Sequence, residues 1–112
     1  MHLEQIQAFR AWFDQYVKGF SSDDPEIQAG IKLKYAHTRR VCQNIFNIGK
    51  TLGLPEGDLH LAEAVALFHD VGRFRQYTVY HTFNDRRSEN HALLGIKELE
   101  REQVLAGLPA AL

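Results

Sequence analysis

The stretch that decides the fold of this chain is Ala66-Leu67-Phe68-His69-Asp70-Val71-Gly72-Arg73-Phe74. It is an apolar, helix-forming run that ends in an imidazole and a carboxylate, followed by a glycine and an arginine. A buried imidazole or carboxylate costs several kcal/mol when it has no polar partner. A divalent metal ion is the simplest partner for both side chains. We therefore expect a buried helix that ends at a metal site.

The helical period extends outward from this stretch to both ends of the chain. A helix over about residues 55–71 contains the apolar run Ala64-Val65-Ala66-Leu67-Phe68, which is typical of a central, buried helix. Apolar residues three or four positions apart predict two earlier helices, over about 2–20 and 25–52. A fourth helix is expected over about 89–106, with Gly107-Leu108-Pro109 ending it and an apolar side formed by Leu93, Leu94, Ile96, Leu99 and Val104.

Capping and helix-breaking residues set the expected ends of these helices. Asp23 is expected to cap the second helix, with Pro25 in its first turn, and Ser88 is expected to cap the fourth. Gly72 is expected to break the third. Residues 76–90 lack a steady period and favour strand by propensity around 77–83, but no partner strand is evident. We predict a loop or a short helical turn there.

The predicted fold class is therefore all-α, a bundle of about four to five helices in one domain over residues 1–112. The formal net charge of -1 gives no reason to expect binding to a long nucleic acid or to an anionic membrane. The single cysteine, Cys42, excludes an intramolecular disulfide. No apolar stretch approaches the roughly 20 residues that cross a bilayer, and the first residues lack the features of a signal peptide. These features predict a cytoplasmic protein.

Three histidines and one aspartate are candidate metal ligands: His37, His69, Asp70 and His91. A mixed set of imidazole and carboxylate ligands suits several divalent ions, so Mn, Fe, Zn, Ni, Co and Mg all stay open. Neighbouring residues on a helix point about 100° apart, so His69 and Asp70 share an ion only if it lies between their two directions. A third ligand must then come from another helix. His37, on the preceding antiparallel helix, is the natural candidate.

The order and spacing of these residues resemble a known family. His37 followed by His69-Asp70, with the dyad in an HD-x-G-R sequence, is similar to the HD-domain metal-dependent phosphohydrolases. Downstream residues look like one bacterial HD subfamily, over about residues 30–100, with the pattern Gln76-Tyr77, Thr82-Phe83-Asn84-Asp85, Ser88 and Asn90-His91-Ala92. The resemblance implies an HD-domain-like helical bundle whose metal is held by His37, His69, Asp70 and a later aspartate.

The resemblance also implies a reaction, the hydrolysis of a phosphomonoester or phosphodiester in a small, nucleotide-like substrate. A divalent ion would lower the pKa of a bound water and neutralise charge on a phosphoryl oxygen, with Asp70 as a catalytic residue. A guanidinium holds phosphate through paired donors, so Arg73 is a candidate catalytic and substrate-binding residue. Arg75 is a second candidate for binding the substrate.

Two further residues each have two interpretations. His91 lies where some HD proteins carry an additional histidine for a second metal, or else it makes a hydrogen bond in the first turn of its helix. Asp85 belongs to a solvated charged run, or else it orients a ligand histidine or a water.

One departure from the family pattern leaves a second function open. Family members carry the fourth ligand on a helix well downstream of the dyad, whereas the last aspartate here is Asp85. We expect either a piece of a longer HD domain without its C-terminal helices, or an incomplete metal site. In the second case the chain would be a non-catalytic helical module that binds a nucleotide or a protein partner. A missing helix would leave apolar helix faces exposed, which predicts a homo-oligomer.

Overall fold

The computed structural model describes residues 1–106, and these form five α-helices and one short 3₁₀ helix. The elements are α1 (Leu3–Lys18), α2 (Pro25–Thr51), α3 (Glu56–Phe68), α4 (Gly72–Tyr80), η1 (Asp85–Arg87) and α5 (His91–Arg101). No strand occurs among the described residues. The fold is all-α, as predicted, and none of the described helices is both long and apolar enough to span a bilayer.

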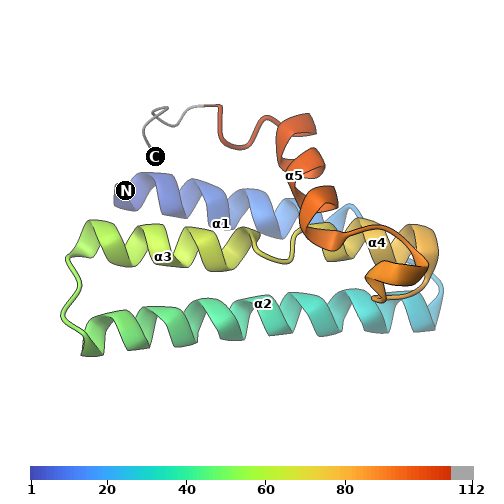
Figure 1. The fold of residues 1–112 in the computed structure, drawn as a ribbon, viewed down its shortest axis with the longest axis horizontal. Coiled ribbons are helices and arrows are strands. Elements are labelled where there is room, and N and C mark those ends of the chain that lie inside the picture. The colour runs from blue at the N-terminus through green and yellow to red at the C-terminus, as the bar shows by residue number, and fades with distance from the viewer. Residues whose placement is uncertain (107–112) are drawn as a thin grey trace.

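The long helices are arranged as a bundle with alternating directions. Helix α2 runs opposite to α1 and α3, and α4 carries on beyond α3 after a short turn (Figure 1). Helix α5 packs on α4. The turn between α3 and α4 therefore lies in the middle of the bundle, facing α2 on one side and the start of α5 on the other.

A shared apolar core holds this arrangement together. Phe13 of α1 and Phe74 of α4 are fully buried and meet edge to face, with ring centroids 5.8 Å apart. Burying a side chain of this size stabilises the fold by roughly 1.5–3 kcal/mol. Leu67 and Val71, on either side of the His69-Asp70 pair, are also fully buried. The core therefore fixes the backbone on both sides of that pair.

Two helices begin at a different cap from the one predicted. The carboxylate of Asp24, not that of Asp23, accepts hydrogen bonds from the backbone of Glu26 and Ile27 and caps α2. The side chain of Asn90, not that of Ser88, caps α5. Helix α5 therefore begins at His91 and ends at Arg101, inside the predicted range of 89–106. The predicted end at residues 107–109 lies outside the described residues.

The third helix is shorter than predicted, and Gly72 does not break it. Helix α3 ends at Phe68, three residues before the predicted end, and Gly72 is the first residue of α4. A Cβ atom at Gly72 would lie 2.2 Å from the carbonyl oxygen of His91 and 2.6 Å from the nitrogen of Gly95. Gly72 is needed because α4 and α5 cross there with their backbones in close approach.

Residues 76–90, predicted as a loop or a short helical turn, contain more helix than predicted in their first five residues. Helix α4 continues to Tyr80, and only the segment after it is irregular apart from η1. The strand propensity of this stretch is overridden by packing on α2, where the ring of Tyr77 lies against Gly30.

Leu93 and Ile96, predicted on the apolar side of the last helix, are more than half exposed.

Candidate metal centre

Asp70 lies at the centre of the polar site. It sits in the turn between α3 and α4, and only 7% of the residue is exposed. Its two carboxylate oxygens face different partners. Oδ2 faces His37 and His69, while Oδ1 faces His91 and Arg73.

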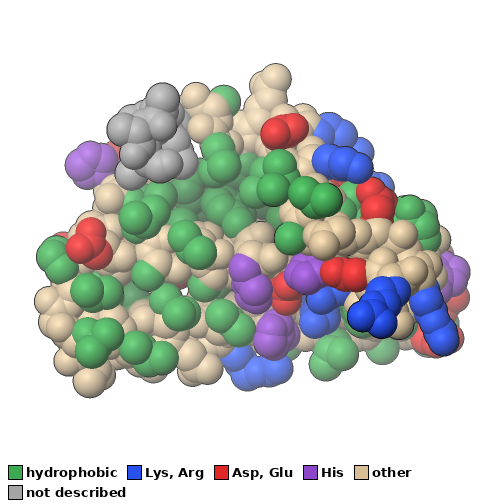
Figure 2. Space-filling model, in the orientation of Figure 1, with side chains coloured by type: hydrophobic (Ala, Val, Ile, Leu, Met, Phe, Trp, Pro, Cys, Tyr) green, Lys and Arg blue, Asp and Glu red, His purple; other side chains and the backbone are tan. Residues whose placement is uncertain are grey.

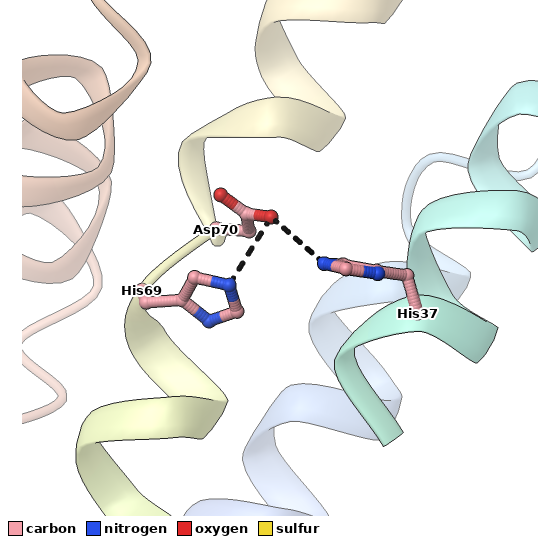
Figure 3. A group of neighbouring side chains, drawn as sticks. All are labelled: His37, His69 and Asp70. Carbon is pink, nitrogen blue, oxygen red and sulfur yellow. Dashed lines mark ion pairs between the residues drawn. The ribbon is translucent and has the colours of Figure 1, made fainter. Parts of the chain in front are cut away.

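On its Oδ2 side, Asp70 forms a group with His37 and His69 that could hold a metal ion. This group is called the metal group below. Nε2 of His69 lies 3.3 Å from Oδ2, and Nε2 of His37, from the facing helix α2, lies 3.7 Å from it (Figure 3). One ligand atom from each of the three residues lies within 4.8 Å of the others. A tetrahedral ion with bonds of about 2.1 Å separates its ligands by about 3.4 Å. The spacing therefore fits a transition metal ion.

The hydrogen bond of His69 supports the same interpretation. Its Nδ1 lies 2.5 Å from the carbonyl oxygen of Ala66, one turn earlier on α3. A carbonyl only accepts, so Nδ1 carries the proton and Nε2 of the neutral ring has a lone pair. That lone pair faces the carboxylate of Asp70, and two acceptors repel unless a proton or a metal cation lies between them. The donor set therefore fits a metal ion, and this hydrogen bond is the kind that orients histidine ligands.

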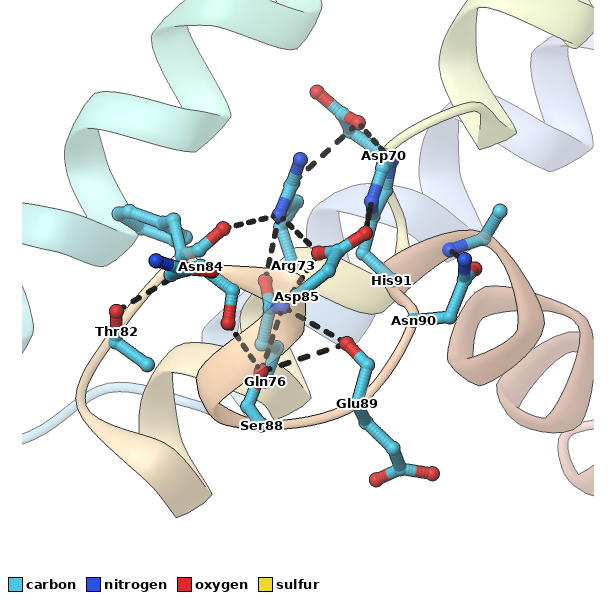
Figure 4. Close-up of polar contacts among 12 residues, drawn as sticks. Asp70, Arg73, Gln76, Thr82, Asn84, Asp85, Ser88, Glu89, Asn90 and His91 are labelled. Atoms are coloured by element: carbon cyan, nitrogen blue, oxygen red, sulfur yellow. Dashed lines mark hydrogen bonds and ion pairs between the residues drawn. The ribbon is translucent and has the colours of Figure 1, made fainter.

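His91 approaches the same carboxylate from the opposite side. As the first residue of α5, it places Nε2 3.4 Å from Oδ1 of Asp70. Its Nδ1 lies 2.9 Å from Oδ2 of Asp85 (Figure 4). Because that carboxylate accepts the Nδ1 proton, Nε2 again has its lone pair directed at Asp70. His91 is outside the group formed by His37, His69 and Asp70, and its assignment to a second ion stays a prediction.

Asp85 belongs to the site and not to a solvated charged run. The hydrogen bond from His91, followed by the one from Gln76, holds the pKa of its carboxyl well below the usual range. Asp85 therefore stays ionised and orients the imidazole of His91, which is one of the two interpretations left open by the sequence. Asn84 helps to place it, because its side chain caps η1 by accepting from the backbone of Arg86.

One nitrogen of the Arg73 guanidinium, Nη1, is committed to protein groups. It donates to the side chains of Gln76 and Asp85 and to the carbonyl oxygen of Phe83, at 2.9, 3.0 and 2.7 Å. The Nε of Arg73 lies 3.8 Å from Oδ1 of Asp70. These contacts join the segment after α4 to the turn that holds Asp70. They favour a positioning role for Arg73, and its contact with substrate stays a prediction.

Arg75 is not brought to the metal group. Its Nε donates to the buried carboxylate of Glu98 on α5, and its guanidinium lies over the ring of Phe20. Residues two positions apart on a helix point about 200° apart, which separates Arg75 from Arg73. The substrate-binding role predicted for Arg75 has no support from these contacts.

The site opens onto one face of the molecule. Figure 2 shows a cluster of histidine side chains in the middle of the visible face, with hydrophobic side chains on one side of it and basic side chains close by. His37 and His69 each expose more than a third of their side chains, whereas Asp70 lies beneath them. A ligand can therefore reach the histidines from solvent.

Gln76 is the residue that the sequence interpretation did not single out for a role in the site. It is fully buried, and its amide contacts Arg73 and Asp85. The only feature of the sequence that could have identified Gln76 is its place within the downstream family pattern, because a single glutamine on a short helix does not by itself predict a role in a site.

Comparison with family models agrees with the geometry. The model of the HD domain matches residues 35–111, which is more than half of the chain and includes every residue of the metal group. No curated protein and no solved structure matches the chain. On the strength of this match, the chain belongs to the HD-domain family.

Proposed function

We propose that this chain is a metal-dependent phosphohydrolase domain that acts on a phosphomonoester or phosphodiester of nucleotide type. The observation that carries the proposal is the convergence of His37 and His69 on Oδ2 of Asp70, with Nδ1 of His69 committed to a backbone carbonyl. A divalent ion bound there supplies a Lewis acid for a phosphoryl oxygen and acidifies a water molecule.

The residues of the chain have separate tasks in this proposal. His37 and His69 offer neutral imidazole nitrogens at the mouth of the site, and Asp70 offers a carboxylate oxygen from beneath them. His91 offers a further nitrogen on the other side of Asp70, oriented by Asp85, where a second ion would bind. Arg73 holds Asp85 and the following segment in place beside the substrate.

A non-catalytic module that binds a nucleotide or a protein partner is the second candidate. One observation favours it: within residues 1–106, the group that could hold an ion has three members, two histidines and one aspartate, and no second carboxylate. Family resemblance implies a fourth ligand for the catalytic members.

Metal analysis and hydrolysis assays on one set of variants test the proposal. We expect protein grown in metal-supplemented medium to contain about one transition metal ion per chain by elemental analysis, since one group of ligands is preformed. Purified protein should then hydrolyse p-nitrophenyl phosphate, its bis-ester or a nucleoside phosphate. Asp70→Ala should abolish both metal content and hydrolysis.

Asp23→Ala is the matched control, because Asp23 is exposed and lies in the connection before α2. It should keep the metal and the activity. Metal-free wild-type protein would overturn the proposal. Bound metal without hydrolysis of any of these esters would favour the non-catalytic module.

A further inference from the structure

Gln76 is an unusual residue to find fully buried. It lies on α4, outside the metal group, and has no exposed surface. Of the polar side chains in the described residues, only Thr38 is buried to the same extent. A primary amide loses its hydrogen bonds to water on burial, so its place is stable only where the protein replaces them.

The protein replaces them at both ends of the amide (Figure 4). Its Nε2 donates to Oδ1 of Asp85 at 2.9 Å, to Oγ of Ser88 at 3.0 Å and to the carbonyl oxygen of Glu89 at 3.1 Å. Its Oε1 accepts from Nη1 of Arg73 at 2.9 Å. Acceptors face one end and a guanidinium faces the other, so only this orientation of the amide satisfies every partner.

These hydrogen bonds gather a segment that has little structure of its own. The described chain between Tyr80 and His91 contains only the three-residue η1. Three positions along it, at 85, 88 and 89, meet the one amide of Gln76. The placement of Asp85 therefore depends on Gln76, together with Arg73 of the same helix, which donates to the same oxygen.

The position of Asp85 determines in turn the direction of His91. One carboxylate oxygen of Asp85 accepts from Gln76 and the other accepts from Nδ1 of His91. Nε2 of His91 then faces Oδ1 of Asp70. A continuous series of polar contacts thus links the buried amide to the central carboxylate of the site.

We propose that Gln76 is a positioning residue that holds Asp85 and thereby keeps His91 directed at Asp70 with Nε2 free to bind a cation. The consequence for metal binding rests on the proposed function, whereas the orientation of His91 does not. Gln76 touches neither the substrate nor the ion in this proposal.

The substitution Gln76→Glu tests the proposal with almost no change in side-chain volume. It replaces the donor with an acceptor that faces Asp85 and the carbonyl of Glu89. Long-range ¹H–¹⁵N spectra of metal-free protein report the imidazole tautomer, with His91 assigned by its loss in His91→Gln. We expect a single Nδ1–H tautomer in the wild type and a mixture of tautomers in Gln76→Glu.

Titration with Co²⁺ provides the second measurement. Loss of an orienting contact behind a ligand lowers metal affinity by about 10- to 100-fold, and we expect a loss of that size for the ion bound by His91. Gln43→Glu is the control, because Gln43 is exposed on α2 and bonds only to Asn47 among the described side chains. It should leave both measurements unchanged.

The double variant Gln76→Glu/Asp85→Asn separates positioning from a general loss of stability. The new amide at position 85 can donate to the new carboxylate at position 76 while its oxygen still accepts from His91. We expect the Nδ1–H tautomer of His91 to return in the double variant, although Asp85→Asn alone should disturb it. If each substitution instead damaged the structure independently, the two losses of stability would add and the tautomer would not return.

The outcomes distinguish the two proposals. The role of Gln76 is overturned if the tautomer of His91 is unchanged in Gln76→Glu. It is also overturned if the double variant folds no better than Asp85→Asn and recovers no more of the Nδ1–H tautomer. This comparison also decides the matter if Gln76→Glu alone does not fold. Absence of Co²⁺ binding in the wild type, with the expected tautomer changes, overturns the proposed function and leaves the role of Gln76 standing.

Discussion

Cys42, the single thiol of the chain, illustrates at the scale of one residue how burial changes chemistry. It lies on α2 among buried side chains, and its Sγ is 3.9 Å from the carbonyl oxygen of Glu63. The side chain of Glu63 is itself paired with Arg10 of α1. Burial, and then the charge of Glu63, raise the pKa of the Cys42 thiol to about 11 from its ordinary value of 9.0.

We predict that this thiol makes the folded state less stable in alkali. Both states keep the proton below pH 9.0, but above it the unfolded chain ionises while the folded thiol stays protonated up to about pH 11. The free energy of unfolding therefore falls as pH rises through this window. Urea unfolding between pH 9.0 and about pH 11 should show that the free energy of unfolding falls more steeply for the wild type than for Cys42→Ala. The variant controls for the titration of tyrosines and lysines, which it keeps. Parallel curves for the two proteins would contradict the prediction.

At the scale of the element, the crossing of α4 and α5 places His91 beside the candidate metal centre. Gly72 begins α4 and packs against the backbone of His91 and Gly95, so α5 starts directly beside the turn that carries Asp70. A bulkier residue at position 72 would force the two helices apart. His91 would move with the start of α5.

We expect Gly72→Ala to lower the free energy of unfolding by about 1–3 kcal/mol, the usual penalty for overpacking. The new Cβ would lie 2.2 Å from the carbonyl oxygen of His91, which is backbone and has little freedom to move aside. Urea unfolding measures the loss. Gly57→Ala is the matched control, because its Cβ would meet the nearest atom at 3.4 Å. A Gly72→Ala protein as stable as Gly57→Ala would refute the close approach.

At the scale of the whole molecule, the bundle leaves an apolar surface on α2 and α3. Ile48 of α2 and Leu52, which follows the last residue of that helix, are more than half exposed, as is Val65 of α3, and Leu61 is 38% exposed. Figure 2 shows hydrophobic side chains spread over this part of the visible face, next to the histidines. Contiguous apolar surface of this kind is typical of an interface.

We predict that the chain associates with a second copy of itself. Burying exposed apolar side chains on α2 and α3 removes them from water, which favours association. Sedimentation velocity from 1 to 100 μM (on the order of the range where weak dimers dissociate) should show a concentration-dependent rise in sedimentation coefficient. Val65→Lys should suppress the rise, whereas Val79→Lys, on α4, should not. A monomer over the whole range would refute the prediction.

Local signals predicted most of the elements. Helices α1 and α2 were expected within two residues of their observed ends, because each has an apolar period and a clear break beside it. The metal group was also predicted from local signals, since His69 and Asp70 are adjacent and His37 lies on the neighbouring antiparallel helix. Helix α4 was predicted only as a loop or a short helical turn, because Tyr77 and its neighbours favour strand until they pack against Gly30.

The sequence by itself determined the helical bundle, the family and the residue types of the group that could hold a metal ion, because these depend on periodicity and on residues within a recognisable motif. Only the tertiary structure decided that Gln76 holds Asp85, that Asp85 orients His91, and that Arg73 turns toward the protein. These contacts depend on the path of the segment between α4 and α5. That path has almost no regular structure, so the packing of Gly72 and the burial of Gln76 determine it.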